Sequence, residues 1–297
     1  MELSTSTNLC AFTRGRERMP VSFCIDTLAD AGYRVLDMNF CVAMNPDSPM
    51  RTENWQDYVE EIRRHAERRG IVFRQSHLPY YDVDRCRGTE KAEEMEELIR
   101  RSILGSARLG VRWAVTHPFT VYSCADDPAR CLQENREYYA PHVALAKENG
   151  LGIALETDFD LPEQKIYCST IGELTELCDA FGDVQAVGIC YDFGHAQLQA
   201  DKRSHREKLR EIGTRLKAVH VQDNHGQEDE HLLPFFGSID WENAMAGLAD
   251  IGYAGDLTFE IQEFGRSLPA DLKHLSAELS IAVGQRLREY YIQAGGK

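Results

Sequence analysis

Short apolar runs alternate with longer amphipathic segments along the whole chain, and this alternation constrains the fold more than any other feature. Each run is about five to eight residues long and apolar on both faces, which is typical of a buried strand in a parallel sheet. The runs lie at 33–40, 71–78, 112–118, 151–157, 186–192, 215–223 and 256–262, with an earlier one near 8–12. Segments with one apolar helical stripe separate them, at 55–70, 89–110, 139–150, 171–182, 204–213, 241–252 and 272–291. Eight strands alternating with helices predict a closed (β/α)₈ barrel.

The competing architecture is a doubly wound open sheet. That fold normally carries a glycine-rich turn after its first strand, and the sequence has none. The chain of 297 residues is somewhat longer than the ~250 residues usual for a (β/α)₈ barrel, which leaves room for a few enlarged loops. No stretch rich in Pro, Gly or Ser divides it. We therefore expect residues 1–297 to form a single (β/α)₈ barrel domain.

The charge of the chain excludes several classes of protein. Lys and Arg total 33 against 48 Asp and Glu, so the net charge is −15. Such a surface repels nucleic-acid phosphates and anionic membranes, and no apolar run reaches the ~18–20 residues that span a bilayer. The nine Cys include no Cys-x-x-Cys pair and indicate reduced thiols. We expect a cytoplasmic protein that binds neither nucleic acid nor membrane; a homo-oligomer is compatible with the sequence.

Polar residues gather where the expected strands end, which is where (β/α)₈ barrels carry their chemistry. Five of the ten His lie at or just beyond these ends: His77, His117, His195, His220 and His231. Acidic residues occupy three of the ends: Glu156, Asp192 and Glu260. A single histidine at a strand end is more often an ordinary rim residue, so the prediction depends on the joint placement.

Two of the carboxylates, Glu156 and Glu260, follow apolar residues on otherwise apolar strands. A buried carboxylate without a partner is very costly, and the basic residues nearest to these ends, Arg74 and Arg112, lie further back on their strands. A bound cation is the remaining partner. Carboxylates combined with imidazoles form a mixed oxygen and nitrogen ligand set that suits Mn²⁺, Mg²⁺, Co²⁺ or Zn²⁺.

Four short motifs occur in order on the later strands. They are IALET with Glu156, YDFGH with Asp192 and His195, AVHVQDN with His220 and Gln222, and FEIQ with Glu260. Together they resemble the xylose isomerase-like TIM-barrel superfamily of sugar isomerases and epimerases, inosose-processing enzymes and endonuclease IV-type nucleases. In that superfamily Lys is frequent where Gln222 stands. The resemblance implies one divalent ion held by Glu156, Asp192, His220 and Glu260.

Two further patterns qualify this resemblance. In HLLPFFGSIDW (231–241), Phe235 and Phe236 replace a Gly and a Glu of the superfamily loop, and either packing or contact with substrate would explain them. In addition, nine residues match the trinuclear zinc ligands of the endonuclease IV group: His77, His117, Glu156, Asp192, His195, His220, Asp229, His231 and Glu260. The net charge of −15 argues against a nuclease, because a duplex would meet acidic protein.

The resemblance implies a metal-dependent isomerase or epimerase that acts on a small-molecule sugar, with Glu156 and Glu260 as paired bases. We expect substrate contacts from His77, His117, His195, His231 and Trp241. Tyr80 and Tyr81 lie where a sugar ring could stack, and the lack of a basic cluster disfavours a phosphorylated sugar. The alternatives are an endonuclease IV-like enzyme, an inosose-type dehydratase and a sugar-binding barrel without catalytic activity.

Overall fold

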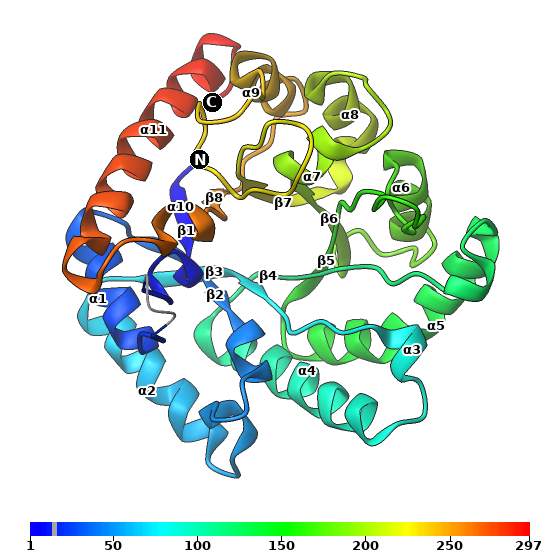
Figure 1. The fold of residues 1–297 in the computed structure, drawn as a ribbon, viewed down its shortest axis with the longest axis horizontal. Helices are drawn as coiled ribbons and strands as arrows, with labels where there is room; N and C mark the ends of the chain where they lie inside the picture. The colour runs from blue at the N-terminus through cyan, green and yellow to red at the C-terminus, as the bar shows by residue number, and fades with distance from the viewer. Residues whose placement is uncertain (14–16) are drawn as a thin grey trace.

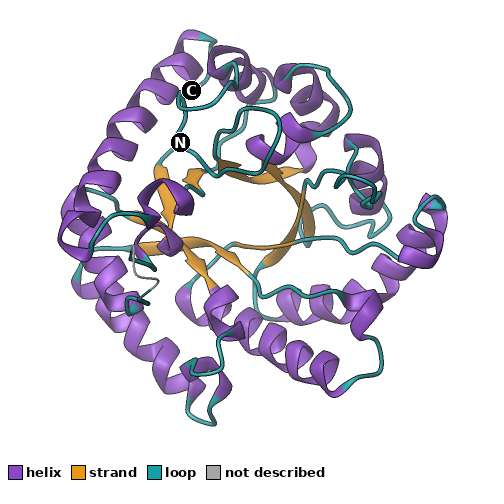
Figure 2. Cartoon of the chain, in the orientation of Figure 1, coloured by secondary structure: helices purple, strands orange, loops and turns teal. Residues whose placement is uncertain are grey.

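Eight parallel strands close into a barrel in the order of the sequence, and a ring of helices surrounds them (Figures 1 and 2). The computed structural model describes residues 1–13 and 17–297. The strands are β1 (Leu3–Ser6), β2 (Val35–Asn39), β3 (Val72–His77), β4 (Trp113–Thr116), β5 (Gly152–Glu156), β6 (Val187–Asp192), β7 (Leu216–Val221) and β8 (Leu257–Phe259). β1 pairs with β8, with Leu3 opposite Leu257 and Thr5 opposite Phe259, so the sheet has no free edge. The predicted (β/α)₈ barrel is confirmed.

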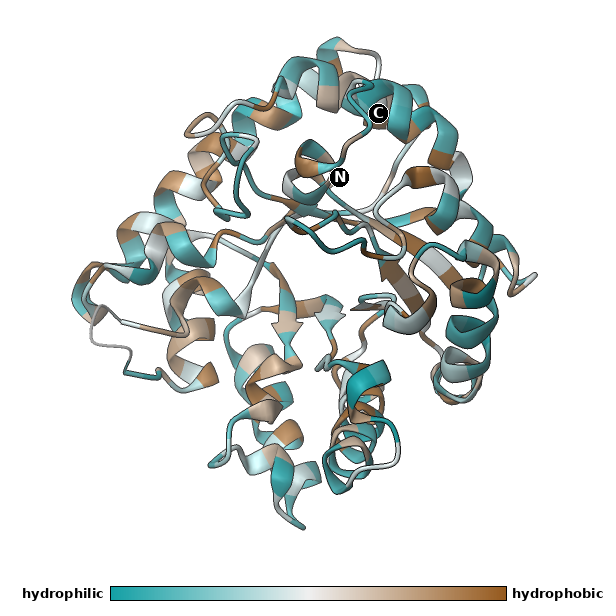
Figure 3. Ribbon diagram, turned by 45° about the vertical axis from the view of Figure 1, so that its right-hand side comes forward, coloured by the Kyte–Doolittle hydropathy of each residue, from teal (hydrophilic) through white to brown (hydrophobic). Residues whose placement is uncertain are grey.

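The helices cover the outside of the barrel, and their apolar stripes face the strands. They are α1 (Val21–Ala31), α2 (Trp55–Arg68), α3 (Val83–Cys86), α4 (Glu90–Leu109), α5 (Pro128–Glu148), α6 (Ile171–Asp179), α7 (Phe193–Leu198), α8 (His205–Ile212), α9 (Trp241–Asp250), α10 (Gln262–Arg266) and α11 (Lys273–Gln293). On α2, for example, Trp55, Val59 and Ile62 are buried at helical spacing. Figure 3 shows hydrophobic and hydrophilic stretches alternating along these helices. α11 packs beside α1 and α9 and completes the ring.

The apolar interior has two parts. The larger core lies between the strands and the helices, and a smaller cluster of Val115, Ala154, Cys190 and Ala218 fills the inside of the barrel. These four residues come from β4 to β7, one to three positions before the strands end. They therefore form an apolar floor beneath the carboxyl-terminal mouth, where the polar strand-end residues lie.

The first strand differs from the prediction. The expected run near 8–12 is not a strand; Thr7–Cys10 form a 3₁₀ turn and β1 lies earlier, at Leu3–Ser6. Its residues are mostly Ser and Thr, so it lacks an apolar signature, yet Thr5 is fully buried and its hydroxyl donates to the Phe259 carbonyl (3.2 Å). Hydroxyls that find backbone acceptors can occupy a barrel interior. The sequence analysis also did not predict α1 or the first half of α5.

All nine cysteines lie in the described part of the chain and are free. Among the described helices, none is both long enough and apolar enough to cross a bilayer.

The long loop between β7 and α9 is organised around the buried side chain of Asp223. Its Oδ1 accepts hydrogen bonds from the backbone amides of Asn224 (2.9 Å) and Ile239 (3.1 Å). Its Oδ2 accepts from the Phe235 amide (3.0 Å) and from the Trp241 indole Nε1–H (2.9 Å). Four donors on one carboxylate fix the path of this loop, which carries Asp229 and His231 to the mouth of the barrel.

We expect Asp223→Ala to lower the free energy of unfolding by about 3 kcal/mol, because it leaves buried donors without an acceptor. Asp240→Ala is the matched control. The Asp240 side chain caps α9 by accepting from the Asn243 amide at an exposed site, so its loss should cost only about 1 kcal/mol. Urea denaturation of both variants measures the difference, and equal losses would contradict the central role of Asp223.

Candidate functional site

Four of the predicted ligands meet at the carboxyl-terminal mouth of the barrel. Glu156 ends β5, Asp192 ends β6, His220 lies on β7 and Glu260 follows β8 directly. One ligand atom from each lies within 4.8 Å of the others. His220 Nδ1 is 2.6 Å from Glu156 Oε1 and 3.3 Å from Glu260 Oε2. We call these four residues the central group; the strands bring them together although they span more than a hundred positions in sequence.

A second group shares Glu156 with the first. His77 ends β3 and His117 follows β4, and the Nε2 atom of each lies 3.3 Å from Glu156 Oε2. The two carboxylate oxygens of Glu156 therefore face different histidines, with Oε1 toward His220 and Oε2 toward this pair. A carboxylate in this position has the geometry of a bridge between two cations.

A third group lies further out. His195 comes from α7, and Asp229 and His231 come from the β7–α9 loop. Asp229 Oδ2 is 3.4 Å from His195 Nε2 and 2.9 Å from His231 Nε2. His231 has a φ of 47°, a left-handed conformation that is uncommon outside glycine and is often found at functional sites.

Three of these histidines have the same orientation, and it leaves one ring nitrogen available to a ligand. In each, Nδ1 lies 2.9 Å from a backbone carbonyl oxygen: His77 from Leu78, His195 from Thr157 and His231 from Glu260. A carbonyl oxygen only accepts, so we assign the proton to Nδ1. Nε2 is then unprotonated in the neutral ring and points toward a carboxylate of its group, which is how metal-binding histidines are usually held.

The buried carboxylates lack the cationic partners that their burial requires. Glu156 Oε2 and Asp192 Oδ2 have no hydrogen-bond partner, and both side chains are completely buried. Over residues 1–13 and 17–297, the ion pairs of these carboxylates are made only with histidines. A divalent cation would supply the missing charge, so the donor set and its unpartnered oxygens fit a metal ion.

The pKa values of the buried carboxylates shift in different directions, according to how closely imidazoles surround each one. Burial raises the pKa of Asp192 to about 7, and His195 offsets only part of this effect. Burial acts in the same direction on Glu156, but His220 and the other neighbouring imidazoles outweigh it and hold the pKa of Glu156 well below its usual range. Burial would also lower the pKa of His231, yet Asp229 raises it to about 9.

Gln222 connects the central and the outer groups, a role that the sequence did not reveal. Its Nε2 donates to Asp192 Oδ1 (3.1 Å) and to Asp229 Oδ1 (2.7 Å). The close approach of Gly194 makes room for this amide, because a Cβ at Gly194 would lie 2.1 Å from it. Gln222 stands where the superfamily often has Lys, so a neutral donor replaces a cation beside the site.

Asp37 is a second residue that sequence reasoning missed. It is buried on β2 near His220 and His77, and burial raises its pKa to about 6. The signal was present, since Asp37 is a carboxylate within an apolar run, as Glu156 is. It lies in the middle of its run, however, and not at the end.

The remaining predicted contacts have different surroundings. Trp241 is buried at the start of α9, packs against Phe193 and donates to Asp223, which leaves little surface for its predicted substrate contact. Phe235 and Phe236 are about half exposed; Phe236 packs edge-on against Phe264, and Phe235 lies near Tyr290.

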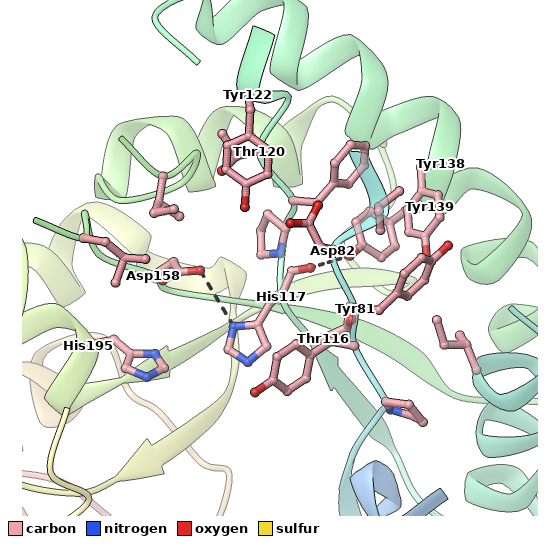
Figure 4. Close-up of a pocket in the computed structure, with 18 residues that line it drawn as sticks. Tyr81, Asp82, Thr116, His117, Thr120, Tyr122, Tyr138, Tyr139, Asp158 and His195 are labelled. Carbon is pink, nitrogen blue, oxygen red and sulfur yellow. Dashed lines mark hydrogen bonds and ion pairs between the residues drawn. The ribbon is translucent and has the colours of Figure 1, made fainter. Parts of the chain in front are cut away.

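A cavity of about 440 Å³ opens beside His117 and His195 (Figure 4). The β3–α3, β4–α5 and β5–α6 loops supply most of its walls. It is of the size that small-molecule sites usually have.

Two relatives are similar to this chain over most of its length. "Uncharacterized protein MJ1311" of Methanocaldococcus jannaschii is 29% identical over 206 residues, which are 68% of each chain. "Uncharacterized protein y4fM" of Sinorhizobium fredii is 26% identical over 251 residues, which are 81% of this chain and 70% of the relative.

Solved structures share the fold at low identity. A D-tagatose 3-epimerase-like protein superposes with a TM-score of 0.74 at 20% identity, covering 99% of this chain and 98% of its own. D-psicose 3-epimerase, solved in the presence of D-fructose, gives 0.73 at 15% identity, with 97% and 99% covered. The 3-keto-D-glucoside 4-epimerase YcjR of E. coli gives 0.69 at 15% identity, with 97% and 99% covered. At these identities the likeness establishes the common fold alone.

The family model described as "Xylose isomerase-like TIM barrel" matches residues 25–278, which include the strands from β2 to β8 and all nine residues of the three groups. The chain belongs to the xylose isomerase-like TIM-barrel family.

Proposed function

We propose that this protein is a divalent-metal-dependent epimerase or isomerase of a sugar. The observation that carries the proposal is the pair of buried carboxylates Glu156 and Glu260, three strands apart around the barrel, with His220 Nδ1 in contact with both. Two carboxylates on separate strands can approach a bound substrate from different sides.

The chemical task is to remove a proton from a carbon beside a carbonyl and return it on the other face or to the neighbouring carbon. A base for this step must be ionised and held in place. Burial alone would raise the pKa of Glu260, but His220 and His231 lower it, and Glu156 is held ionised in the same way. One carboxylate would take the proton and the other would return it.

A divalent ion held by Glu156, Asp192, His220 and Glu260 would supply electrostatic stabilisation for the negative charge that develops on the substrate oxygens. The chain's own residues would prepare the site for this ion. Gln222 orients Asp192, and the apolar floor of the barrel keeps water away from beneath the carboxylates. The known 3-epimerases with this fold support the choice of reaction class.

With Mn²⁺ added, we expect the wild-type protein to exchange hydrogen at carbon between a ketose such as D-fructose or D-tagatose and D₂O. Glu156→Gln and Glu260→Gln should each slow this exchange by roughly a hundredfold or more, because an amide cannot act as the base. NMR of the recovered sugar measures the exchange. The control is Glu148→Gln, at an exposed position near the end of α5. Wild-type exchange in either site variant would contradict the two-base scheme.

Metal content tests the ligand assignment independently of activity. After loading with Mn²⁺ or Zn²⁺ and removal of free ions, we expect about one divalent ion per chain, detected by elemental analysis. Glu156→Gln should reduce the content more than Asp229→Asn, because Glu156 belongs to two groups and Asp229 to one. Equal losses in the two variants would contradict the central position of Glu156.

A phosphodiesterase of the apurinic endonuclease type is the second candidate, and a specific observation favours it. The group of His77, His117 and Glu156 and the group of His195, Asp229 and His231 add two further ligand sets beside the central one. Clustered metal ions are well suited to phosphoester hydrolysis. The net charge of −15 weighs against a DNA duplex as substrate, because few phosphates would be neutralised.

A duplex oligonucleotide with one tetrahydrofuran abasic site separates the two candidates. With zinc-loaded protein in tenfold excess, we expect no cleavage on a denaturing gel, because an acidic protein gains little from counterion release. The catalytic site itself can be tested with a small phosphodiester such as bis(p-nitrophenyl) phosphate, which needs no duplex. Three zinc ions per chain together with cleavage of the abasic strand would favour the nuclease.

A further inference from the structure

The cavity beside the site borders it at His117 and His195, and many of its other lining residues are tyrosines. We define the tyrosine pocket as the part of the 440 Å³ cavity that is lined by Tyr80, Tyr81, Tyr122, Tyr138 and Tyr139. Figure 4 shows tyrosine rings on the side of His117 away from His195. His117 and His195 line the cavity, and His117 Nε2 lies 3.3 Å from Glu156 Oε2, so the cavity borders the carboxylates at His117.

His117 is the point where the two parts meet. Its Nε2 lies 3.3 Å from Glu156 Oε2, and its ring centroid lies 4.9 Å from that of Tyr80. Tyr80 also lies 5.9 Å from the ring of His77, and half of its surface is exposed. Only the His117 side chain therefore separates Tyr80, at the entrance to the pocket, from Glu156.

Apart from its two histidines, the residues that line the cavity include more acidic than basic side chains. Asp82 and Asp158 line it, whereas none of the described lining residues is Lys or Arg. The nearest cation is Arg85, which lies over the Tyr122 ring at 4.2 Å from its centroid and is paired with Asp82 at 3.3 Å. A phosphate group near Asp158 would meet a carboxylate that, among the described residues, is paired only with the His117 imidazole at 3.9 Å, while hydroxyl groups could donate to Asp158.

Three of the five tyrosines are held in place by hydrogen bonds from their hydroxyls. The hydroxyls of Tyr81 and Tyr138 both donate to Glu96 Oε1 at 2.6 Å, and Glu96 Oε2 is 2.8 Å from His142 Nε2. The Tyr139 hydroxyl donates to the carbonyl of His117. Because these hydroxyls are already occupied, the rings offer their faces and edges, which are the surfaces that pack against a sugar ring.

From these contacts we infer that the site takes an uncharged substrate of two linked rings, in which the reacting sugar lies at the carboxylates and a second, unphosphorylated ring lies in the tyrosine pocket. The inference rests on the proposed sugar epimerase or isomerase function. A cavity of about 440 Å³ that begins at His117, beside Glu156, offers more room than a single six-carbon sugar fills. Because its described lining residues include two carboxylates and neither Lys nor Arg, it favours an uncharged second ring over a phosphate.

Three ketoses that differ only at O6 test the inference. D-Fructose carries a hydroxyl there, D-fructose 6-phosphate a phosphate, and isomaltulose a glucosyl ring. Isothermal titration calorimetry on Mn²⁺-loaded protein should give isomaltulose about fivefold tighter binding than D-fructose, since an added aromatic contact has an energy of this order. D-Fructose 6-phosphate should bind more weakly than D-fructose. Tighter binding of the phosphate, no gain for isomaltulose or no binding of any probe would overturn the inference.

Variants locate the second ring. Tyr122→Ala, in the 3₁₀ turn Tyr122–Cys124, should remove the advantage of isomaltulose and leave the affinity for D-fructose unchanged. Tyr80→Ala, beside His77 and His117, should weaken the binding of both sugars. Asp158→Asn should reduce the difference in affinity between D-fructose and D-fructose 6-phosphate, because it removes a negative charge from the cavity. Tyr290→Ala, on α11 outside the cavity, is the matched control and should change none of these values. An isomaltulose advantage that persists in Tyr122→Ala would overturn the inference.

The same samples separate failure of this inference from failure of the proposed function. Exchange of substrate hydrogen with solvent measures turnover, whereas calorimetry measures the ranking of the three ketoses by affinity. Exchange without the expected binding order would leave the epimerase or isomerase proposal standing and remove the two-ring substrate. The expected order without exchange of any probe would count against the catalytic proposal instead.

Discussion

The burial of the Glu156 carboxylate is the constraint on which the site depends. It has no exposed surface, and its two oxygens face different histidines. A buried anion of this kind is stable only when positive charge surrounds it, and His77, His117 and His220 are placed around it by three separate strands. The closed barrel brings those strands to one mouth. The charge balance around Glu156 therefore depends on the fold.

Much of this arrangement could be predicted from the sequence, because position along a strand determines position in a barrel. Glu156, Asp192 and His220 each lie at or near the end of an apolar run, and the carboxyl ends of parallel strands meet at one mouth. β1 was hidden because three of its four residues are Ser or Thr, which leave no apolar pattern although they are buried. The role of Gln222 could not be predicted either. Its two hydrogen bonds, to Asp192 and Asp229, depend on the folded structure and leave no pattern in the sequence.

The tyrosine pocket illustrates the other limit of sequence reasoning. The sequence indicated that Tyr80 and Tyr81 could stack on a sugar, since they follow a strand end directly. Tyr122 and Tyr138 come from a 3₁₀ turn and a helix elsewhere in the chain, and only the packing of α4 against α5 brings Tyr81 and Tyr138 to the same Glu96 carboxylate. A surface that several loops form together cannot be predicted from local sequence patterns, because its residues are far apart in the chain.

The sharing of Glu156 between two ligand groups has a consequence for how substitutions would act on the site. Loss of His117 or of Asp229 would leave all four central ligands in place, whereas loss of Glu156 would damage two sets at once. Substitutions at the periphery would thus change the number of cation sites that the scaffold offers without disturbing the central one. Glu156 allows no such separation, because its replacement alters the central group and the group of His77 and His117 together.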